Sequence, residues 1–160
     1  MKLVTVKDTI AKYPRISAGN VESTIALPNH LARNVSELNI LRLKNTPHSG
    51  GSRTDWPSHL WLKCHKGDNV GHSDVYGRMN WDKPSPTLTC KCNSISNGRF
   101  GHPEQDRAIS LREAAALQTF DDNFIFYGTQ CDIAKHIGNA VPPLLAQVFA
   151  ETIKKHLDES

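Results

Sequence analysis

The sequence lacks a long apolar run and is poor in aromatic residues. Aromatic residues make up 7% and hydrophobic residues 38% of its 160 positions. Without about 20 consecutive apolar residues a helix cannot span a bilayer, so we expect no membrane partner. The N-terminus also lacks the apolar segment of a signal peptide. The length fits one ordinary domain, and because the apolar content is low we expect a protein partner to complete part of the core.

The sequence also lacks the regularly spaced cysteine pairs of a disulfide framework. Its four cysteines stand at uneven intervals, so we expect reduced thiols and a cytoplasmic location. Six residues could in principle supply four zinc ligands: Cys64, His65, His72, Cys90, Cys92 and His102. Their spacing matches no common zinc knuckle. We therefore favour unliganded thiols and no metal site, with a small zinc-structured interaction domain as a minor alternative.

The net charge is small, but the charges are unevenly distributed. The whole chain carries +3. Residues 1–107 hold fifteen Lys and Arg against nine Asp and Glu, a balance of +6, whereas residues 108–160 hold four against seven, a balance of −3. A basic first part beside a mildly acidic second part fits a DNA-facing module joined to a segment that packs against protein. Ordinary surface variation explains so modest an imbalance equally well.

Two helix ends are predicted to meet near the C-terminus. Gly138 favours a left-handed end to a helix covering about Thr129 to Ile137. Asn139 is then expected to cap the next helix, whose first turn tolerates Pro142 and Pro143. A polar ligand held between the two ends is the functional interpretation, and a plain helix-turn-helix linker is the structural one. The second helix carries an apolar stripe that we interpret as a packing face: Val141, Leu144, Leu145, Val148, Phe149, Thr152 and Ile153.

Further local patterns predict short strands and helix starts. The alternation at Leu3–Val6 and at Thr87–Cys92 predicts strands, and Asn97-Gly98 predicts a turn. Capping residues predict helix starts at Ser36, at Ser110 with Glu113, and at Thr129 with Asp132. The apolar side of the first of these helices is expected to contain Leu38, Leu41 and Leu43.

Three sequence motifs follow one another at residues 76–89, 107–120 and 137–143. They read Tyr-Gly-Arg-Met-Asn-Trp-Asp-Lys-Pro-Ser-Pro-Thr-Leu-Thr, then Arg-Ala-Ile-Ser-Leu-Arg-Glu-Ala-Ala-Ala-Leu-Gln-Thr-Phe, then Ile-Gly-Asn-Ala-Val-Pro-Pro. In order and spacing they resemble the C-terminal motifs of the DNA cytosine-5 methyltransferase family. Residues 4–10 resemble the start of that family's target-recognition region. The resemblance covers about residues 4 to 155 and implies the C-terminal part of such an enzyme.

Other motifs of that family are missing from the sequence. The family attacks cytosine with a cysteine that follows a proline, whereas the cysteines here follow Lys63, Thr89, Lys91 and Gln130. The Glu-Asn-Val segment that holds the flipped base is absent, as is the Phe-x-Gly-x-Gly loop for S-adenosylmethionine. The resemblance therefore implies a chain without catalytic residues, inactive alone. A subunit of a split enzyme, a truncated gene product and an excised fragment all fit.

The resemblance implies that residues 1–106 bind double-stranded DNA. The family's Thr-Leu pair, matched by Thr87 and Leu88, approaches the phosphate beside the target base, where a hydroxyl and a backbone N–H can fix the register. A β-branched strand residue is the structural alternative for Thr87. Further candidate DNA contacts are Arg78, Lys91, Gly98 and Arg99. Among them Arg99 is the preferred base reader, because arginine can bind guanine bidentately.

The resemblance assigns residues 107–160 to a helical segment that packs on the catalytic domain. In the family, the last motif closes one side of the S-adenosylmethionine pocket. Asn139 matches the residue that donates or accepts hydrogen bonds there, and Ala140 and Val141 match the residues that pack closely. A helix-capping role for Asn139 is compatible with this. Arg107 is expected to be structural, pairing with Glu113 or capping carbonyl groups.

Together these patterns predict an α+β protein. Residues 1–106 are expected to form a small, irregular β-rich target-recognition domain, followed by C-terminal helices (107–160) that belong to an α/β, Rossmann-like methyltransferase domain. An apolar patch should be exposed where that domain is missing. The implied partners are double-stranded DNA and a catalytic methyltransferase half, with S-adenosylmethionine bound only alongside that half. The alternative is a stand-alone DNA-binding or regulatory module that kept the fold without the enzyme.

Overall fold

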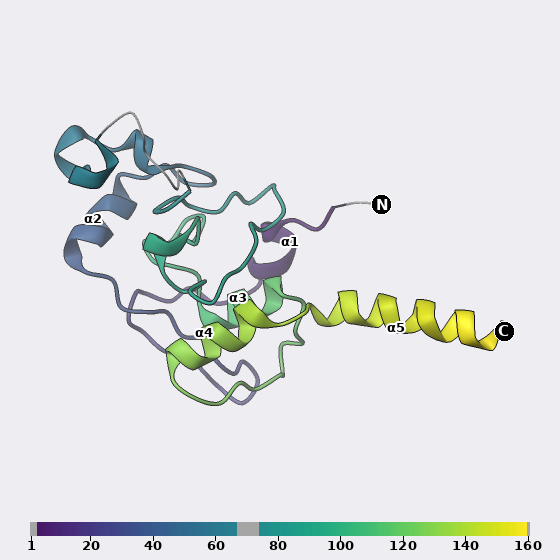
Figure 1. Ribbon diagram of the computed structural model, residues 1–160. Helices are drawn as coiled ribbons and strands as arrows, with labels where there is room; N and C mark the ends of the chain where they lie inside the picture. The colour runs from purple at the N-terminus through teal and green to yellow at the C-terminus, as the bar shows by residue number, and fades with distance from the viewer. Residues whose placement is uncertain (1–2, 67–73, 160) are drawn as a thin grey trace.

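The computed structural model describes residues 3–66 and 74–159. Its α-helices are α1 (Val6–Ile10), α2 (Glu37–Lys44), α3 (Leu111–Leu117), α4 (Gln130–Asn139) and α5 (Pro143–Asp158). Its 3-10 helices are η1 (Arg53–Asp55), η2 (Ser58–Leu60), η3 (Lys63–His65) and η4 (Ile95–Asn97). Irregular segments link these elements into one body, from which α5 projects as a single rod (Figure 1). None of the helices within these ranges is long and apolar enough to cross a bilayer.

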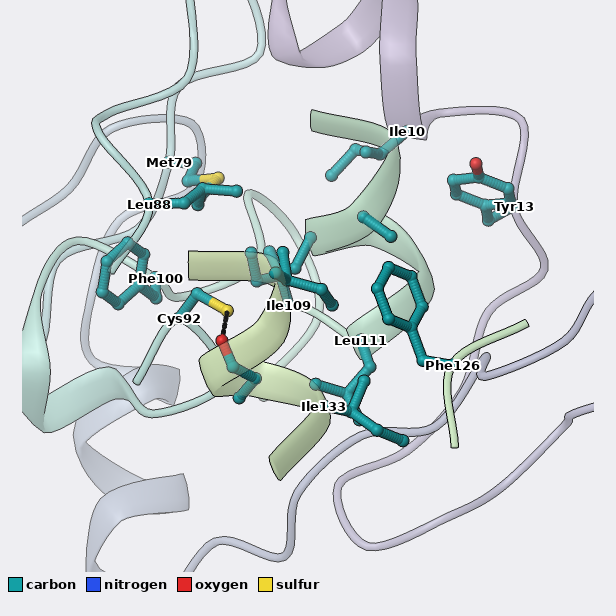
Figure 2. Close-up of a cluster of buried hydrophobic side chains, with 14 of the residues drawn as sticks. Ile10, Tyr13, Met79, Leu88, Cys92, Phe100, Ile109, Leu111, Phe126 and Ile133 are labelled. Atoms are coloured by element: carbon teal, nitrogen blue, oxygen red, sulfur yellow. Dashed lines mark hydrogen bonds between the residues drawn. The ribbon is translucent and has the colours of Figure 1, made fainter. Parts of the chain in front are cut away.

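The main hydrophobic core lies where α1, α3 and α4 meet. Helix α3 packs against both α1 and α4, and α1 buries Val6 and Ile10. Loop side chains fill the rest of the core, among them Leu88 and Phe100 from the segments between η3 and α3 (Figure 2). Because these loop residues are buried against helices, the irregular segments that flank them hold fixed positions on the surface.

The predicted β-rich recognition domain, and with it the α+β class, is wrong. Extended pairing in the described part of the chain is limited to isolated bridges: Val21 with Leu31, Arg78 with Gly101, and Gly101 with Ala108. Hydrophobic burial is achieved by helices and by single anchored loop residues instead of by a sheet.

The two predicted strands fail for local reasons. At Leu3–Val6, the side chain of Thr5 accepts a hydrogen bond from the Asp8 N–H, and this capping box makes Val6 the first residue of α1. At Thr87–Cys92, two preceding prolines lack backbone donors. The Cys92 N–H then bonds back to the Thr89 carbonyl at 3.0 Å, so the segment turns locally instead of pairing with a neighbour.

The three helix starts that were predicted from capping residues are confirmed. Ser110 and Glu113 form a capping box at the start of α3, and Thr129 and Asp132 form one at the start of α4. Ser36 is the N-cap of α2. The expected apolar side of α2 is correct for Leu43, which is buried, and wrong for Leu38 and Leu41, which are exposed.

The predicted junction between α4 and α5 is partly wrong. Gly138 does not end α4 in a left-handed conformation; the helix continues through Asn139, and Ala140 is its C-cap. The glycine serves close packing instead, since a Cβ there would lie 2.3 Å from the Thr89 carbonyl carbon. Asn139 does not cap α5, whose N-cap is Pro142. The tandem prolines do stand at the start of α5, as predicted.

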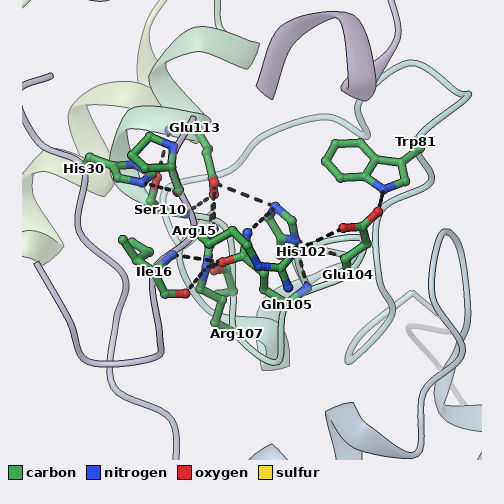
Figure 3. A network of polar contacts seen from close by, with 12 residues as sticks. Arg15, Ile16, His30, Trp81, His102, Glu104, Gln105, Arg107, Ser110 and Glu113 are labelled. Atoms are coloured by element: carbon green, nitrogen blue, oxygen red, sulfur yellow. Dashed lines mark hydrogen bonds and ion pairs between the residues drawn. The ribbon is translucent and has the colours of Figure 1, made fainter. Parts of the chain in front are cut away.

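A buried ionic network fixes the segment that leads into α3 (Figure 3). Two guanidinium nitrogens of Arg107 donate to the Glu113 carboxylate, each at 2.7 Å, and both side chains are fully buried. The expected pairing of Arg107 with Glu113 is therefore confirmed. Burial alone would raise the pKa of Glu113, but the hydrogen bonds and charge of Arg107 outweigh it and lower that pKa.

Candidate functional site

A hollow of about 320 Å³ lies between the segment around Thr87 and the turn after η4. Three of the residues predicted to contact DNA line it: Thr87, Gly98 and Arg99. Thr89 and Asn97 line it as well. Sequence positions about ten residues apart thus share one surface, as the DNA-binding prediction requires.

The local sequence explains why Thr87 faces outward. Leu88 is 7% exposed and belongs to the main core (Figure 2), so the residues on either side of it, Thr87 and Thr89, are exposed. Gly98 lies against a second anchor, because a Cβ there would stand 2.5 Å from the ring of the buried Phe100. Two buried side chains therefore set the two walls of the hollow.

Arg99 is held at the edge of the hollow by backbone carbonyl groups. Its Nη1 donates to the carbonyl oxygens of Gly50, Gly51 and Arg78 at 3.0, 3.2 and 3.3 Å. Its Nη2 lies 3.6 Å from a carboxylate oxygen of Asp74, a largely exposed side chain. One nitrogen is thus anchored, while the other has a loose partner that an incoming acceptor can replace.

Arg78 lies in the interior, away from the hollow. Its side chain is 0% exposed. Its guanidinium donates to the carbonyl oxygens of Leu43, Thr46, His102 and Gln105 and pairs with Asp106. Such saturation with buried acceptors argues against a contact of Arg78 with DNA. Lys91, in contrast, is exposed on the turn that follows Cys90.

The predicted cofactor residues lie at the α4–α5 junction, next to the segment that carries Thr87. The Cys90 thiol donates a hydrogen bond to Asn139 Oδ1 at 2.9 Å. Asn139 and Val141 are exposed and Ala140 is half-buried. Because Gly138 also packs on the backbone of Thr89 and Cys90, the candidate DNA surface and the candidate cofactor surface are in direct contact.

Sequence reasoning missed the side chains that hold this junction. Gln118, just after α3, donates from Nε2 to the carbonyl oxygens of Ile137 and Ala140 at 2.9 and 3.2 Å. Both carbonyls lie at the end of α4, where the Ile137 carbonyl also accepts from the Ala140 N–H at 3.3 Å. The local sequence around Gln118 gives no signal for these hydrogen bonds, and the sequence around Cys90 gives none for its bond to Asn139. The unusual position of Gly138 inside a helix was the available clue.

The cysteines are free thiols in different environments. Cys64 and Cys131 are exposed, Cys90 is half-buried and Cys92 is buried. Burial raises the pKa of Cys92 to about 11, which keeps this thiol protonated. Across residues 3–66 and 74–159, groups of three or more His, Cys, Asp or Glu side chains placed to hold a metal are not found. His72, one of the considered zinc ligands, lies outside the described residues.

Comparison with known proteins relates this arrangement to one enzyme family. The chain matches the family model for C-5 cytosine-specific DNA methylase over residues 5–155. Type II methylase M.HgiDII of Herpetosiphon aurantiacus is 43% identical over 163 residues, which cover 96% of this chain and 44% of that protein. DNA (cytosine-5)-methyltransferase 3 of Arabidopsis thaliana is 33% identical over 181 residues, 96% of this chain and 13% of that protein. The chain spans less than half the length of these relatives, and it belongs to the C-5 cytosine-specific DNA methylase family.

Proposed function

We propose that the chain is the C-terminal, DNA-recognising part of a DNA (cytosine-5-)-methyltransferase. Such an enzyme flips a cytosine out of the duplex and methylates its C5 atom. In this proposal the chain selects the DNA site and forms one wall of the cofactor pocket, while a catalytic half supplies the nucleophilic cysteine. The observation that carries the proposal is the contact between Cys90 and Asn139 at 2.9 Å, which joins the two predicted surfaces within a family member.

The DNA side of the proposal is supported by the exposed groups around the hollow. The hydroxyl of Thr87 and the nearby Gly98 backbone suit a phosphate, whose register they would fix without reading the sequence. Lys91 suits a second phosphate contact. Arg99 suits base recognition through Nη2, since its loose pair with Asp74 can be exchanged for a guanine acceptor.

The cofactor side is supported by the groups at the junction. Asn139 Oδ1 is already bonded to Cys90, which orients the amide and leaves Nδ2 to donate to a polar group of the cofactor. Val141, 63% exposed, provides apolar surface beside it. These residues fit one wall of a pocket. S-adenosylmethionine, when bound there, supplies the methyl group.

The partner side is supported by α5. Its apolar residues Leu144, Leu145, Val148, Phe149, Ile153 and Leu157 are all between 47% and 68% exposed. The first turn of α5 borders a hollow of about 900 Å³ that is also lined by Leu117 and Phe120. We propose that the catalytic half covers this helix and fills this hollow, which completes the small core.

Co-expression with a catalytic half tests the proposal. The partner should be a polypeptide that carries the family's Pro-Cys and Glu-Asn-Val motifs, and methylated cytosines in the host plasmid are mapped by bisulfite sequencing. We expect site-specific methylation with both polypeptides and none with either alone. Leu145→Asp should abolish it, because a carboxylate would be buried unpaired, whereas Gln147→Asp on the same helix should not. Methylation by this chain alone contradicts the proposal, as does equal methylation by the catalytic half in the absence of this chain. Duplex binding by the chain without any methylation in the co-expression favours a stand-alone DNA-binding module.

A further inference from the structure

Another cavity, of about 240 Å³, is lined by residues of η4 and of the segment that precedes it. The segment before α2 forms one wall, with Arg33 and Ser36, and the residues that lead into η4 form the other, with Asn93 and Ser94. Ile95 and Ala108, which are buried in a small apolar cluster, also line the cavity. The cavity therefore combines an apolar part with several polar groups that have hydrogen-bond donors.

Asn93 is the unusual member of this cavity. Its side chain is 4% exposed, and its amide nitrogen Nδ2 has no hydrogen-bond partner among the residues that the structure describes. A buried N–H without an acceptor is costly to leave unpaired. A small hydrophobic residue would fill this place without that cost, so the amide points to an acceptor supplied by a ligand.

The other groups also favour an acceptor with negative charge. Helix α2 begins here, and within the described ranges its N-cap Ser36 makes no side-chain hydrogen bond to the first turn. The N–H groups of this turn and the positive end of the helix therefore remain open to a ligand. Arg33 adds a full positive charge at the exposed edge. Glu37, in the first turn of α2, is exposed and does not line the cavity.

We propose that this cavity binds a backbone phosphate of the DNA duplex, separate from the phosphate assigned to Thr87. The proposal rests on the proposed function. Residues 94–98 form one turn that lines both this cavity and the hollow beside Thr87. Because the two sites are this close, a phosphodiester of the duplex bound at the hollow is favoured over a free anion. DNA that crosses this turn contacts both. The first-turn N–H groups of α2 and Arg33 then donate to phosphate oxygens, and the Asn93 amide joins them when its side chain turns into the cavity.

Two variants of the full chain test the proposal through duplex binding at several salt concentrations. Asn93→Leu should leave the Tm unchanged or raise it, since it removes an unpaired buried amide, yet weaken duplex binding by roughly tenfold, the typical value of a hydrogen bond to a charged group. Arg33→Gln should reduce the slope of log K against log salt by about one. Lys154→Gln, which removes a positive charge from the projecting helix, is the matched control and should change neither quantity much.

Titration of the ¹⁵N-labelled chain with dimethyl phosphate and with inorganic phosphate gives an independent readout. We expect dimethyl phosphate to shift the Asn93 side-chain amide and the first backbone amides of α2. Unchanged duplex binding in both variants overturns the cavity proposal and leaves the proposed function intact, even if inorganic phosphate shifts these signals. A lower Tm for Asn93→Leu with normal duplex binding assigns the amide a structural role and also overturns it. A wild-type chain that does not bind duplex overturns the cavity proposal, whereas the proposed function is decided by the co-expression experiment.

Discussion

Helices α4 and α5 are neighbours in the sequence and both are amphipathic, but their surroundings differ completely. Helix α4 buries Ile133, Ala134 and Ile137 against α3 and the loop that carries Leu88. Helix α5 has sixteen residues and none of them is buried. The apolar face of α4 packs within this chain, whereas the large apolar residues of α5 are exposed in the described part of the molecule. Figure 1 shows α5 projecting away from the packed body.

The difference shows that the amphipathic pattern of a helix predicts a packing face but does not indicate whether its partner surface lies in the same chain or in another one. An isolated helix of this length is marginal in water, and tertiary packing is what normally stabilises it. The packed body should therefore respond to mutation and pH as a cooperative unit, while α5 should be nearly independent of it until a partner binds. The following predictions test that separation.

The largest effect is expected from shortening equivalent apolar side chains in the two helices. Ile137→Ala should lower the free energy of unfolding by about 2–5 kcal/mol, because it leaves a cavity in the core. Leu145→Ala should change it by about 0.5 kcal/mol or less, because Leu145 is 47% exposed. Urea denaturation of both variants checks this. Similar losses for the two would mean that α5 packs on the body in solution.

Acid should destabilise the packed body through His102. Burial lowers the pKa of His102 from 6.5 to about 4, so the folded state favours the neutral ring. Its 3.8 Å approach to Glu113 is therefore not an ion pair at neutral pH. The stabilisation is complete above the unfolded pKa and is lost as the pH falls from about 6.5 through 4, by at most about 3 kcal/mol.

The lowered pKa of Glu113 adds a second loss at still lower pH, below its unfolded value of 4.5. Urea denaturation between pH 7 and 4 measures the first step. His102→Gln should flatten the curve in that window, whereas His59→Gln, at an exposed position, should leave it unchanged. An equally steep curve for both variants would exclude His102 as the titrating group.

Specificity for DNA should depend on Arg99 more than on Lys91, within the same packed body. Arg99→Lys keeps the charge but cannot anchor one nitrogen on the backbone carbonyls while presenting Nη2 to a base, so in the assembled enzyme discrimination at one base pair should fall by about 1 kcal/mol. Lys91→Ala should weaken all sequences alike. Methylation of a randomised duplex library checks both variants. An unchanged site preference for Arg99→Lys would remove Arg99 as a base reader.

The smallest effect is expected at the joint between the two helices. Asn139→Ala should leave assembly intact, because Asn139 lies outside the apolar face of α5. It should weaken S-adenosylmethionine binding by about 1 kcal/mol through a lost hydrogen bond. Calorimetric titration of the reconstituted enzyme measures this, with Cys90→Ser as a variant that keeps a hydroxyl donor toward Asn139. Equal affinity for Asn139→Ala and wild type would leave Asn139 with a structural role.

Sequence reasoning identified the features that local chemistry determines. The capping boxes at Ser110 and Thr129 were predictable because donor and acceptor stand three residues apart. The Thr87–Cys92 strand was wrong because a strand needs a partner, and pairing is not encoded locally. The burial of Arg78 was missed for a similar reason: its acceptors include carbonyl groups 24 to 35 residues away. The unpaired Asn93 amide could not be predicted either, because its surroundings are set by residues distant in the sequence.

The packing of Gly138 against Thr89 and Cys90 also limits how such enzymes can be recombined. A Cβ at residue 138 would lie 2.3–2.5 Å from backbone atoms of these two residues, so the α4–α5 segment and residues 87–92 fit one another as a matched pair. A chimaera that imports residues 87–92 from a relative should carry the relative's residues 137–143 as well. The proposed base reader Arg99 lies outside this matched pair, so an exchange of specificity at residue 99 should disturb the proposed cofactor wall least.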